Sequence, residues 1–195
     1  MFTRLRSFVT LLLFMLSGTT FAQVLKTNDN TVNLGIGFGS TVTYGHGMKG
    51  FPALSLSYEH IFPKEIGPGL LGVGAIVAYR AASYKESVVD EEGPSGTYKF
   101  RYSNTYLGLR ATYHWKGLLS EKYDIYGAAI AGVRLEKYKW DGPKSEFDAF
   151  YNYNHTKVFG GLVVGARYYF LPKVSVFSEL GYDVSWFKIG VSARL

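Results

Sequence analysis

The charged residues of this chain recur at alternate positions in stretches that are otherwise apolar or rich in glycine. In YLGLRATYHW, residues 106–115, Leu107 and Leu109 share one side of an extended chain and Arg110 falls on the other. Counting by twos along eight such stretches places nine charges opposite the apolar side. These nine are Glu59, Arg80, Arg110, Arg134, Glu136, Arg167, Glu179, Lys188 and Arg194. Because charges in a confined space must pair or meet water, we expect an interior network of salt bridges.

The alternating stretches themselves predict strands, since a period of two is the mark of an extended chain with one buried side. They span residues 32–39, 53–62, 70–80, 106–115, 123–136, 158–170, 174–182 and 187–195. One side is essentially uncharged, and the other carries glycine, serine and nearly every charge of the strands. Glycine belongs where space is tight, as inside a narrow barrel, and a soluble barrel has the opposite polarity. The predicted fold is therefore all-β: an eight-stranded antiparallel transmembrane β-barrel with its apolar side in lipid.

The first residues predict an N-terminal signal peptide. Arg4 and Arg6 precede an apolar run over residues 8–16, and Ala22 closes a stretch of small and polar residues. That run is shorter than the approximately 20 residues of a spanning helix. We expect residues 1–22 to be the signal peptide and residues 23–195 to form one barrel domain. The chain has no cysteine, so no disulfide or thiolate metal site is expected.

Three of the connectors are long and polar, and those between them are short. The long ones are expected over residues 40–50, 84–99 and 139–156. Small membrane barrels put short turns on the periplasmic side and longer loops outside the cell. Four aromatic residues of the third loop lie among asparagines, a composition suited to contact with a partner. We expect them either to contact a glycan, lipopolysaccharide or protein, or to fold over the mouth: Phe147, Phe150, Tyr151 and Tyr153.

The signal, the eight alternating strands, the loop asymmetry and the final strand together resemble a known family. The chain is similar to the small outer-membrane β-barrel proteins of Gram-negative bacteria, of the OmpA/OmpX-like group and the outer membrane beta-barrel domain of Bacteroidetes type. The resemblance implies a cell outer membrane location, outer-membrane lipid and lipopolysaccharide as surroundings, and the barrel-assembly machinery as a partner during biogenesis. Many such barrels end on an aromatic residue, whereas this chain ends Arg194-Leu195.

Small barrels of this kind include lipid A-modifying enzymes, but no catalytic constellation is expected here. The deacylase type needs a histidine and a serine two residues apart on the lipid side. His114 has Thr112 at that spacing and both face inward, while His60 is flanked by Tyr58 and Phe62. A loop site could draw on Ser40, His46 and Asp141, whose spacing fixes no geometry.

The expected function is a structural, adhesive or partner-binding role through the extracellular loops, above a closed and salt-bridged interior. The alternatives are a narrow channel for small solutes and a lipid A-modifying enzyme. No cofactor or metal is expected. Nucleic acid is not expected as a partner, because the 21 basic residues are spread along strands and turns.

Overall fold

The computed structural model describes residues 25–41, 49–88, 96–118, 122–141 and 153–195. The predicted signal peptide and the loop residues Phe147, Phe150 and Tyr151 lie outside these ranges. The strands are β1 (Asn30–Phe38), β2 (Lys49–Gly50), β3 (Ala53–Ile61), β4 (Gly69–Val88), β5 (Gly96–Trp115), β6 (Tyr123–Asp141), β7 (Tyr153–Leu171), β8 (Val174–Tyr182) and β9 (Phe187–Arg194). One short 3-10 helix, Lys116–Leu118, follows β5. No helix of the described chain is long and apolar enough to cross a membrane.

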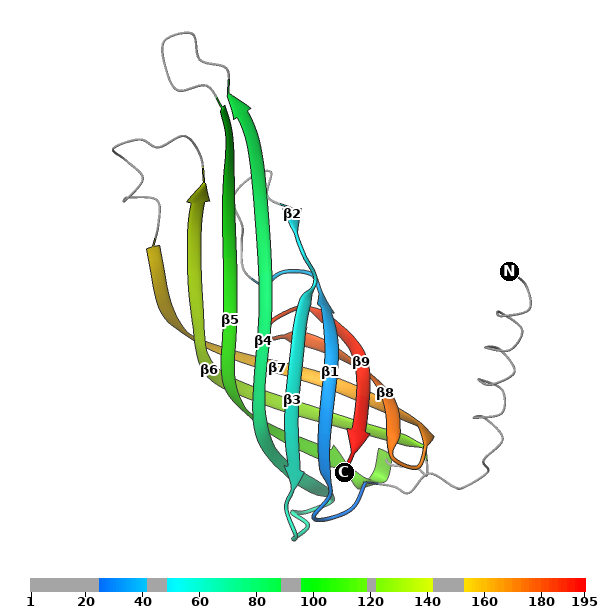
Figure 1. Cartoon of the computed structure of the whole chain (residues 1–195). Coiled ribbons are helices and arrows are strands. Elements are labelled where there is room, and N and C mark those ends of the chain that lie inside the picture. Colours follow the sequence, from blue (N-terminus) through cyan, green and yellow to red (C-terminus); the bar gives the residue numbers. More distant parts are fainter. Residues whose placement is uncertain (1–24, 42–48, 89–95, 119–121, 142–152) are drawn as a thin grey trace, which may run out of the picture.

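Eight of these strands form a closed ring. Each pairs antiparallel with the next along the chain, in the order β1, β3, β4, β5, β6, β7, β8 and β9, and β9 pairs back with β1 (Figure 1). The predicted eight-stranded antiparallel barrel is confirmed. Closure gives the backbone groups of the barrel wall hydrogen-bond partners from neighbouring strands, as hydrocarbon surroundings demand.

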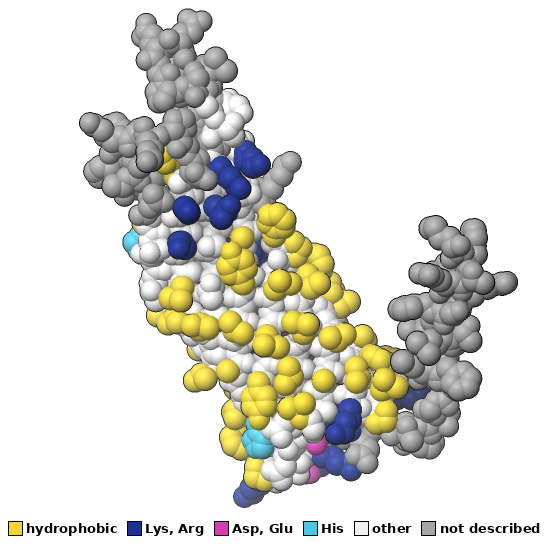
Figure 2. Space-filling model, viewed as in Figure 1, with side chains coloured by type: hydrophobic (Ala, Val, Ile, Leu, Met, Phe, Trp, Pro, Cys, Tyr) yellow, Lys and Arg dark blue, Asp and Glu magenta, His cyan; other side chains and the backbone are white. Residues whose placement is uncertain are grey.

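The apolar side of the wall faces outward. Burial alternates residue by residue along β3, where Leu54, Leu56 and Tyr58 are exposed and the residues between them are buried. Farther round the wall, Leu109 is 74% exposed and Val158 is 86% exposed. Figure 2 shows hydrophobic side chains as a broad belt across the visible face of the barrel. An apolar belt of this extent is stable only when another apolar phase covers it.

Four strands continue beyond the belt. β4 runs on to Val88, β5 starts at Gly96, β6 ends at Asp141 and β7 starts at Tyr153, so these strands rise past their neighbours (Figure 1). We call residues 80–88, 96–104, 136–141 and 153–157 the projecting sheet. Loops were predicted over much of it because the apolar alternation stops there. Strand pairing continues through tyrosine, threonine and tryptophan, which favour strands without being aliphatic.

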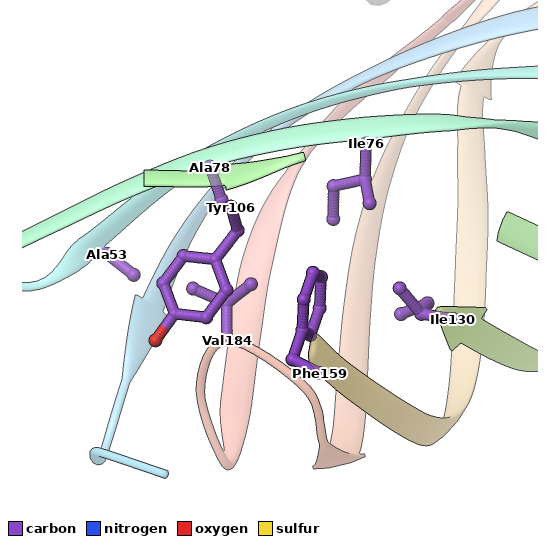
Figure 3. Close-up of a cluster of buried hydrophobic side chains, with 7 residues drawn as sticks. All are labelled: Ala53, Ile76, Ala78, Tyr106, Ile130, Phe159 and Val184. Atoms are coloured by element: carbon purple, nitrogen blue, oxygen red, sulfur yellow. The ribbon is translucent and has the colours of Figure 1, made fainter. Parts of the chain in front are cut away.

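An apolar layer crosses the barrel interior below the projecting sheet. Its members come from five different strands and the β8–β9 link: Ala53, Ile76, Ala78, Tyr106, Ile130, Phe159 and Val184 (Figure 3). The rings of Tyr106 and Phe159 meet edge to face, with centroids 5.1 Å apart. At the opposite end Leu25, Ile61 and Leu70 form a second buried cluster. The interior is thus filled with side chains at both ends.

Glycine at position 190 makes room for an interior ring. A Cβ there would overlap the carbonyl oxygen of Leu34 and stand 2.7 Å from Cε1 of Phe177. We expect Gly190→Ala to lower the free energy of unfolding by about 1–3 kcal/mol through overpacking. Gly160→Ala is the matched control, because its Cβ would meet nothing closer than the Ile130 carbonyl oxygen at 3.5 Å. Urea unfolding of both variants in detergent measures the difference, and equal midpoints would contradict the packing argument.

Candidate functional site

A group of ionic side chains surrounds Glu59 deep in the barrel. Arg167 bridges two carboxylates, with Nη2 2.6 Å from Glu59 Oε2 and Nη1 3.1 Å from Asp124 Oδ2. His114 bridges the same pair from the other side, with Nε2 2.8 Å from Glu59 Oε1 and Nδ1 2.8 Å from Asp124 Oδ1. The Thr112 hydroxyl also donates to Glu59. All five side chains are buried, so every charge depends on these partners.

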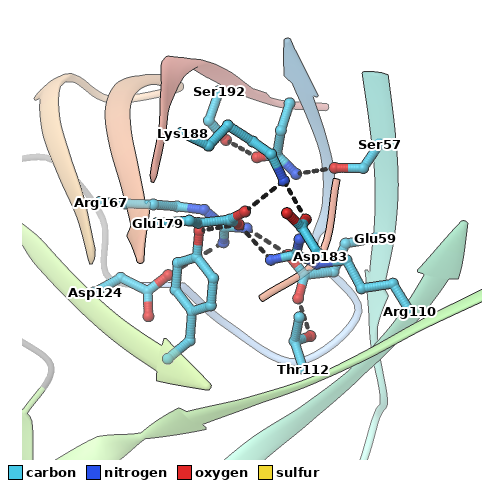
Figure 4. Close-up of polar contacts among 12 residues, drawn as sticks. Ser57, Glu59, Arg110, Thr112, Asp124, Arg167, Glu179, Asp183, Lys188 and Ser192 are labelled. Carbon is cyan, nitrogen blue, oxygen red and sulfur yellow. Dashed lines mark hydrogen bonds and ion pairs between the residues drawn. The ribbon is translucent and has the colours of Figure 1, made fainter. Parts of the chain in front are cut away.

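A second ionic group is centred on Glu179 (Figure 4). Its carboxylate accepts hydrogen bonds from Arg110 Nη2 at 2.5 Å, from Lys188 Nζ at 3.0 Å and from the Tyr126 hydroxyl at 2.8 Å. Lys188 Nζ also lies 2.6 Å from Asp183 Oδ2. The Tyr126 ring joins the two groups, because the Arg167 guanidinium lies 4.6 Å from its centroid and the Arg110 guanidinium 5.7 Å.

The charges of the two groups balance if His114 is an imidazolium. Four carboxylates face three permanent cations: the acids are Glu59, Asp124, Glu179 and Asp183, and the bases are Arg110, Arg167 and Lys188. Both ring nitrogens of His114 contact a carboxylate oxygen, and each can stabilise it only by donating a proton. The doubly protonated ring satisfies both contacts and supplies the fourth positive charge.

Polarity in this molecule is therefore inverted relative to a soluble protein, with ionic groups inside and aliphatic side chains outside a ring without edges. This is the architecture of a small outer-membrane β-barrel. The barrel interior brings together five of the nine residues expected there: Glu59, Arg110, Arg167, Glu179 and Lys188.

The other four expected charges lie nearer the two ends of the barrel. Arg80 donates to the carbonyl of Gly39, and Arg134 pairs with Glu136 at the base of the projecting sheet. At the opposite end Arg194 donates to the Pro172 carbonyl at 2.7 Å. The sequence predicted a single network of nine charges. The structure instead has a central network of ionic side chains and separate contacts at each end of the barrel.

Sequence reasoning missed several members of the network. Asp124 and Tyr126 begin a predicted strand, and both share the inward parity of Arg134, so the pattern contained their signal. Asp183 lies in the link between β8 and β9, where alternation no longer applies. His114 was expected to face inward, but its two carboxylate partners are close only in the folded barrel.

A smaller ionic cluster is centred on Glu136 at the base of the projecting sheet. Arg134 Nη2 lies 2.5 Å from Glu136 Oε1 and Lys157 Nζ 3.0 Å from Oε2. Burial by itself raises the pKa of the Glu136 carboxyl, but hydrogen bonds from Lys157 and Tyr102 outweigh it and the pKa lies below its ordinary value. Burial and the bond to Glu136 raise the pKa of Tyr102, which is therefore a neutral donor.

The projecting sheet carries a row of aromatic rings on the face that continues the barrel interior. We call it the aromatic face: Tyr84, Phe100, Tyr102, Tyr138, Trp140 and Tyr153. Neighbouring rings lie 6.3 Å apart for Tyr84 and Phe100 and 5.2 Å apart for Tyr138 and Tyr153, the latter pair stacked at 9°. Of the four expected loop contacts, Tyr153 is the one that the structure describes, and it belongs to β7.

The opposite face of the projecting sheet is basic. We call it the cationic face: Lys85, Lys99, Arg101, Lys137 and Lys139. These side chains share parity with the lipid-facing residues of the same strands. Lys85 pairs with Lys99 across β4 and β5, and Arg101 pairs with Lys139 across β5 and β6. Basic side chains gather directly above the apolar belt in Figure 2. Among the described side chains of this face there is no aspartate or glutamate to offset them.

The described histidines do not form a nucleophile–base pair with serine. His60 Nδ1 lies 2.9 Å from Asn30 Oδ1, and the ring of His155 packs 5.0 Å from that of Tyr153. His114 is enclosed by carboxylates. Of the loop residues considered for a lipid-modifying site, His46 and the side chain of Asp141 lie outside the described part.

Comparison with known proteins gives structural likenesses alone. No family model and no curated protein sequence matches the chain. The attachment invasion locus protein Ail of Yersinia pestis, solved in complex with the heparin analogue sucrose octasulfate, is 12% identical, with a TM-score of 0.41 over 85% of this chain and 93% of that one. A second structure of Ail is 9% identical, with a TM-score of 0.38 over the same shares.

Proposed function

We propose that this protein is an integral outer-membrane barrel with a sealed, non-enzymatic interior, whose function is to bind acidic carbohydrate at the cell surface. The apolar belt supports the membrane location, since it matches what a lipid bilayer covers. The cationic face carries the binding proposal. It lies beyond the apolar belt, on the part of the barrel that would stand clear of the bilayer (Figure 2).

The arrangement of the cationic face favours a polyanionic ligand. Like charges directly opposite each other on neighbouring strands destabilise a sheet, and this sheet has two such pairs, Lys85–Lys99 and Arg101–Lys139. Among the side chains that the structure describes, no carboxylate pairs with these five residues; Asp141, whose side chain lies outside the described part, is opposite Lys99 in the register of β5 and β6. A bound anion would relieve the repulsion and gain from several cations at once.

The filled interior supports a binding protein rather than a channel. An apolar layer lies across the lumen around Tyr106 and Phe159, and beneath it the ionic side chains are paired with one another. An ion crossing the barrel would have to displace both. The same enclosure keeps His114 away from lipid and solvent, which opposes a catalytic role.

Binding of a heparin fragment to the barrel in nanodiscs of zwitterionic lipid tests the proposal. We expect the triple variant Lys99→Ser, Lys137→Ser and Lys139→Ser to weaken binding about tenfold, as three solvent-exposed charge contacts of ~0.5 kcal/mol each would imply. Binding by the unchanged protein should also weaken with added salt, because exposed charges are screened.

The matched control removes the same charge from the other end of the barrel, through Lys26→Ser, Lys64→Ser and Lys173→Ser, all exposed there. Its affinity should equal that of the unchanged protein. An equal loss in both triple variants would show a response to net charge and would refute a site on the cationic face.

A further inference from the structure

The aromatic face offers the flat apolar surface of several rings. Its rings lie on four adjacent strands and meet in sequence, with Phe100 and Tyr138 6.3 Å apart and Tyr138 and Tyr153 5.2 Å apart. Tyr153 is 42% exposed, and the other rings are partly exposed. Ring faces of this kind pack against the C–H faces of sugars.

A buried amide lies at the base of this face. Asn104 is 0% exposed and sits between Arg80 and Glu136 in the strand register. Neither its Nδ2 nor its Oδ1 has a hydrogen-bond partner. Buried polar groups ordinarily have hydrogen-bond partners, so a ligand group that both donates and accepts hydrogen bonds would satisfy this amide. A hydroxyl does both.

The charged side chains around Asn104 carry a positive excess. Arg134 and Lys157 face a single described carboxylate, that of Glu136. Glu136 is ionised at neutral pH and holds Arg134 and Lys157 in place beneath the rings. A sugar bearing a carboxylate or sulfate complements this excess, whereas a neutral sugar does not.

We infer that the aromatic face and the polar groups around Asn104 form a binding site for an acidic sugar residue of a glycan chain. The pyranose ring packs on Tyr138 and Tyr153, its acidic group pairs with Arg134 and Lys157, and a hydroxyl satisfies Asn104. The inference rests on the proposed surface function and deepens it. The cationic face recognises charge alone, whereas this site on the opposite side of the same sheet recognises the sugar itself.

Titration of the barrel with hyaluronan tetrasaccharide, followed by tryptophan fluorescence and calorimetry, tests the site. We expect the double variant Tyr138→Leu and Tyr153→Leu to bind about tenfold more weakly, since two ring contacts of ~0.7 kcal/mol convert to that factor. Neutral cellotetraose should bind at least tenfold more weakly than hyaluronan to the unchanged protein. The control is Tyr123→Leu with Tyr168→Leu, a ring pair 5.1 Å apart at the other end of the barrel.

Asn104→Leu separates recognition from structure. It removes an unpaired buried amide at nearly constant volume, so the barrel should become no less stable while the affinity for the tetrasaccharide falls. Unchanged affinity in both this variant and the tyrosine double variant would overturn the inference. If the cationic-face triple variant alone lost the tetrasaccharide, the inference would fail and the proposed function would stand. If the unchanged protein bound neither heparin nor hyaluronan, both would fail.

Discussion

Glu179→Ala lowers the free energy of unfolding of the barrel by about 3–5 kcal/mol, the cost of breaking a buried ion pair by removing one partner. The Glu179 carboxylate lies 2.5 Å from Arg110 Nη2 and 3.0 Å from Lys188 Nζ, and it accepts a hydrogen bond from the Tyr126 hydroxyl. Without this carboxylate, Lys188 still pairs with Asp183. Arg110, which is 3% exposed, loses the carboxylate with which it forms an ion pair. An uncompensated guanidinium enclosed in this way is the source of the penalty.

Urea unfolding from lipid vesicles, followed by the shift between folded and heated forms on a gel, measures this effect. The control is Glu65→Ala, which removes the same side chain from an exposed pair with Lys116 and should change stability by less than about 1 kcal/mol. If Glu179→Ala migrated and unfolded like the unchanged protein, Arg110 would have to be satisfied in another way. The ionic interior would then not be a stabilising element.

The wall of the barrel could be predicted from the sequence because one rule governs it. Lipid outside and a narrow lumen inside give every second residue the same surroundings, so β8 was predicted at Val174–Tyr182, the bounds that it has. The rule fails where the surroundings change. Above the belt both faces of β5 are polar or aromatic, so residues 96–99 were taken for part of a loop and residues 100–105 were not predicted as strand.

The interior could be predicted residue by residue but not contact by contact. Parity shows that Glu59 and Arg167 face inward, yet they are 108 positions apart and parity gives no height or angle around the ring. Their pairing depends on strand tilt and on the registers of all the strands between β3 and β7, which the hydrogen-bonded ladders set. Asp183 was missed for a related reason, since it belongs to a link whose path follows from the strands it joins.

Contact geometry and charge balance both indicate that His114 is an imidazolium. This protonation state can be tested through its effect on stability. His114→Gln removes one positive charge and can donate from one side only, leaving Glu59 and Asp124 to share Arg167. We expect it to cost about 3–5 kcal/mol, comparable to the loss of a partner from a buried ion pair. If His114 were neutral, its replacement by glutamine would lower the free energy of unfolding far less, because glutamine reproduces one of its hydrogen bonds.

The double variant His114→Gln with Asp124→Asn distinguishes charge from packing. It restores neutrality by removing one acid with one base, and Arg167 still has Glu59 at 2.6 Å. If charge balance dominates, the double variant is more stable than His114→Gln alone by about 1–3 kcal/mol, a coupling in the range seen for residues in one network. Urea unfolding at neutral pH gives both values. Additive losses would mean that the ring acts through shape and hydrogen bonding, and the imidazolium assignment would be wrong.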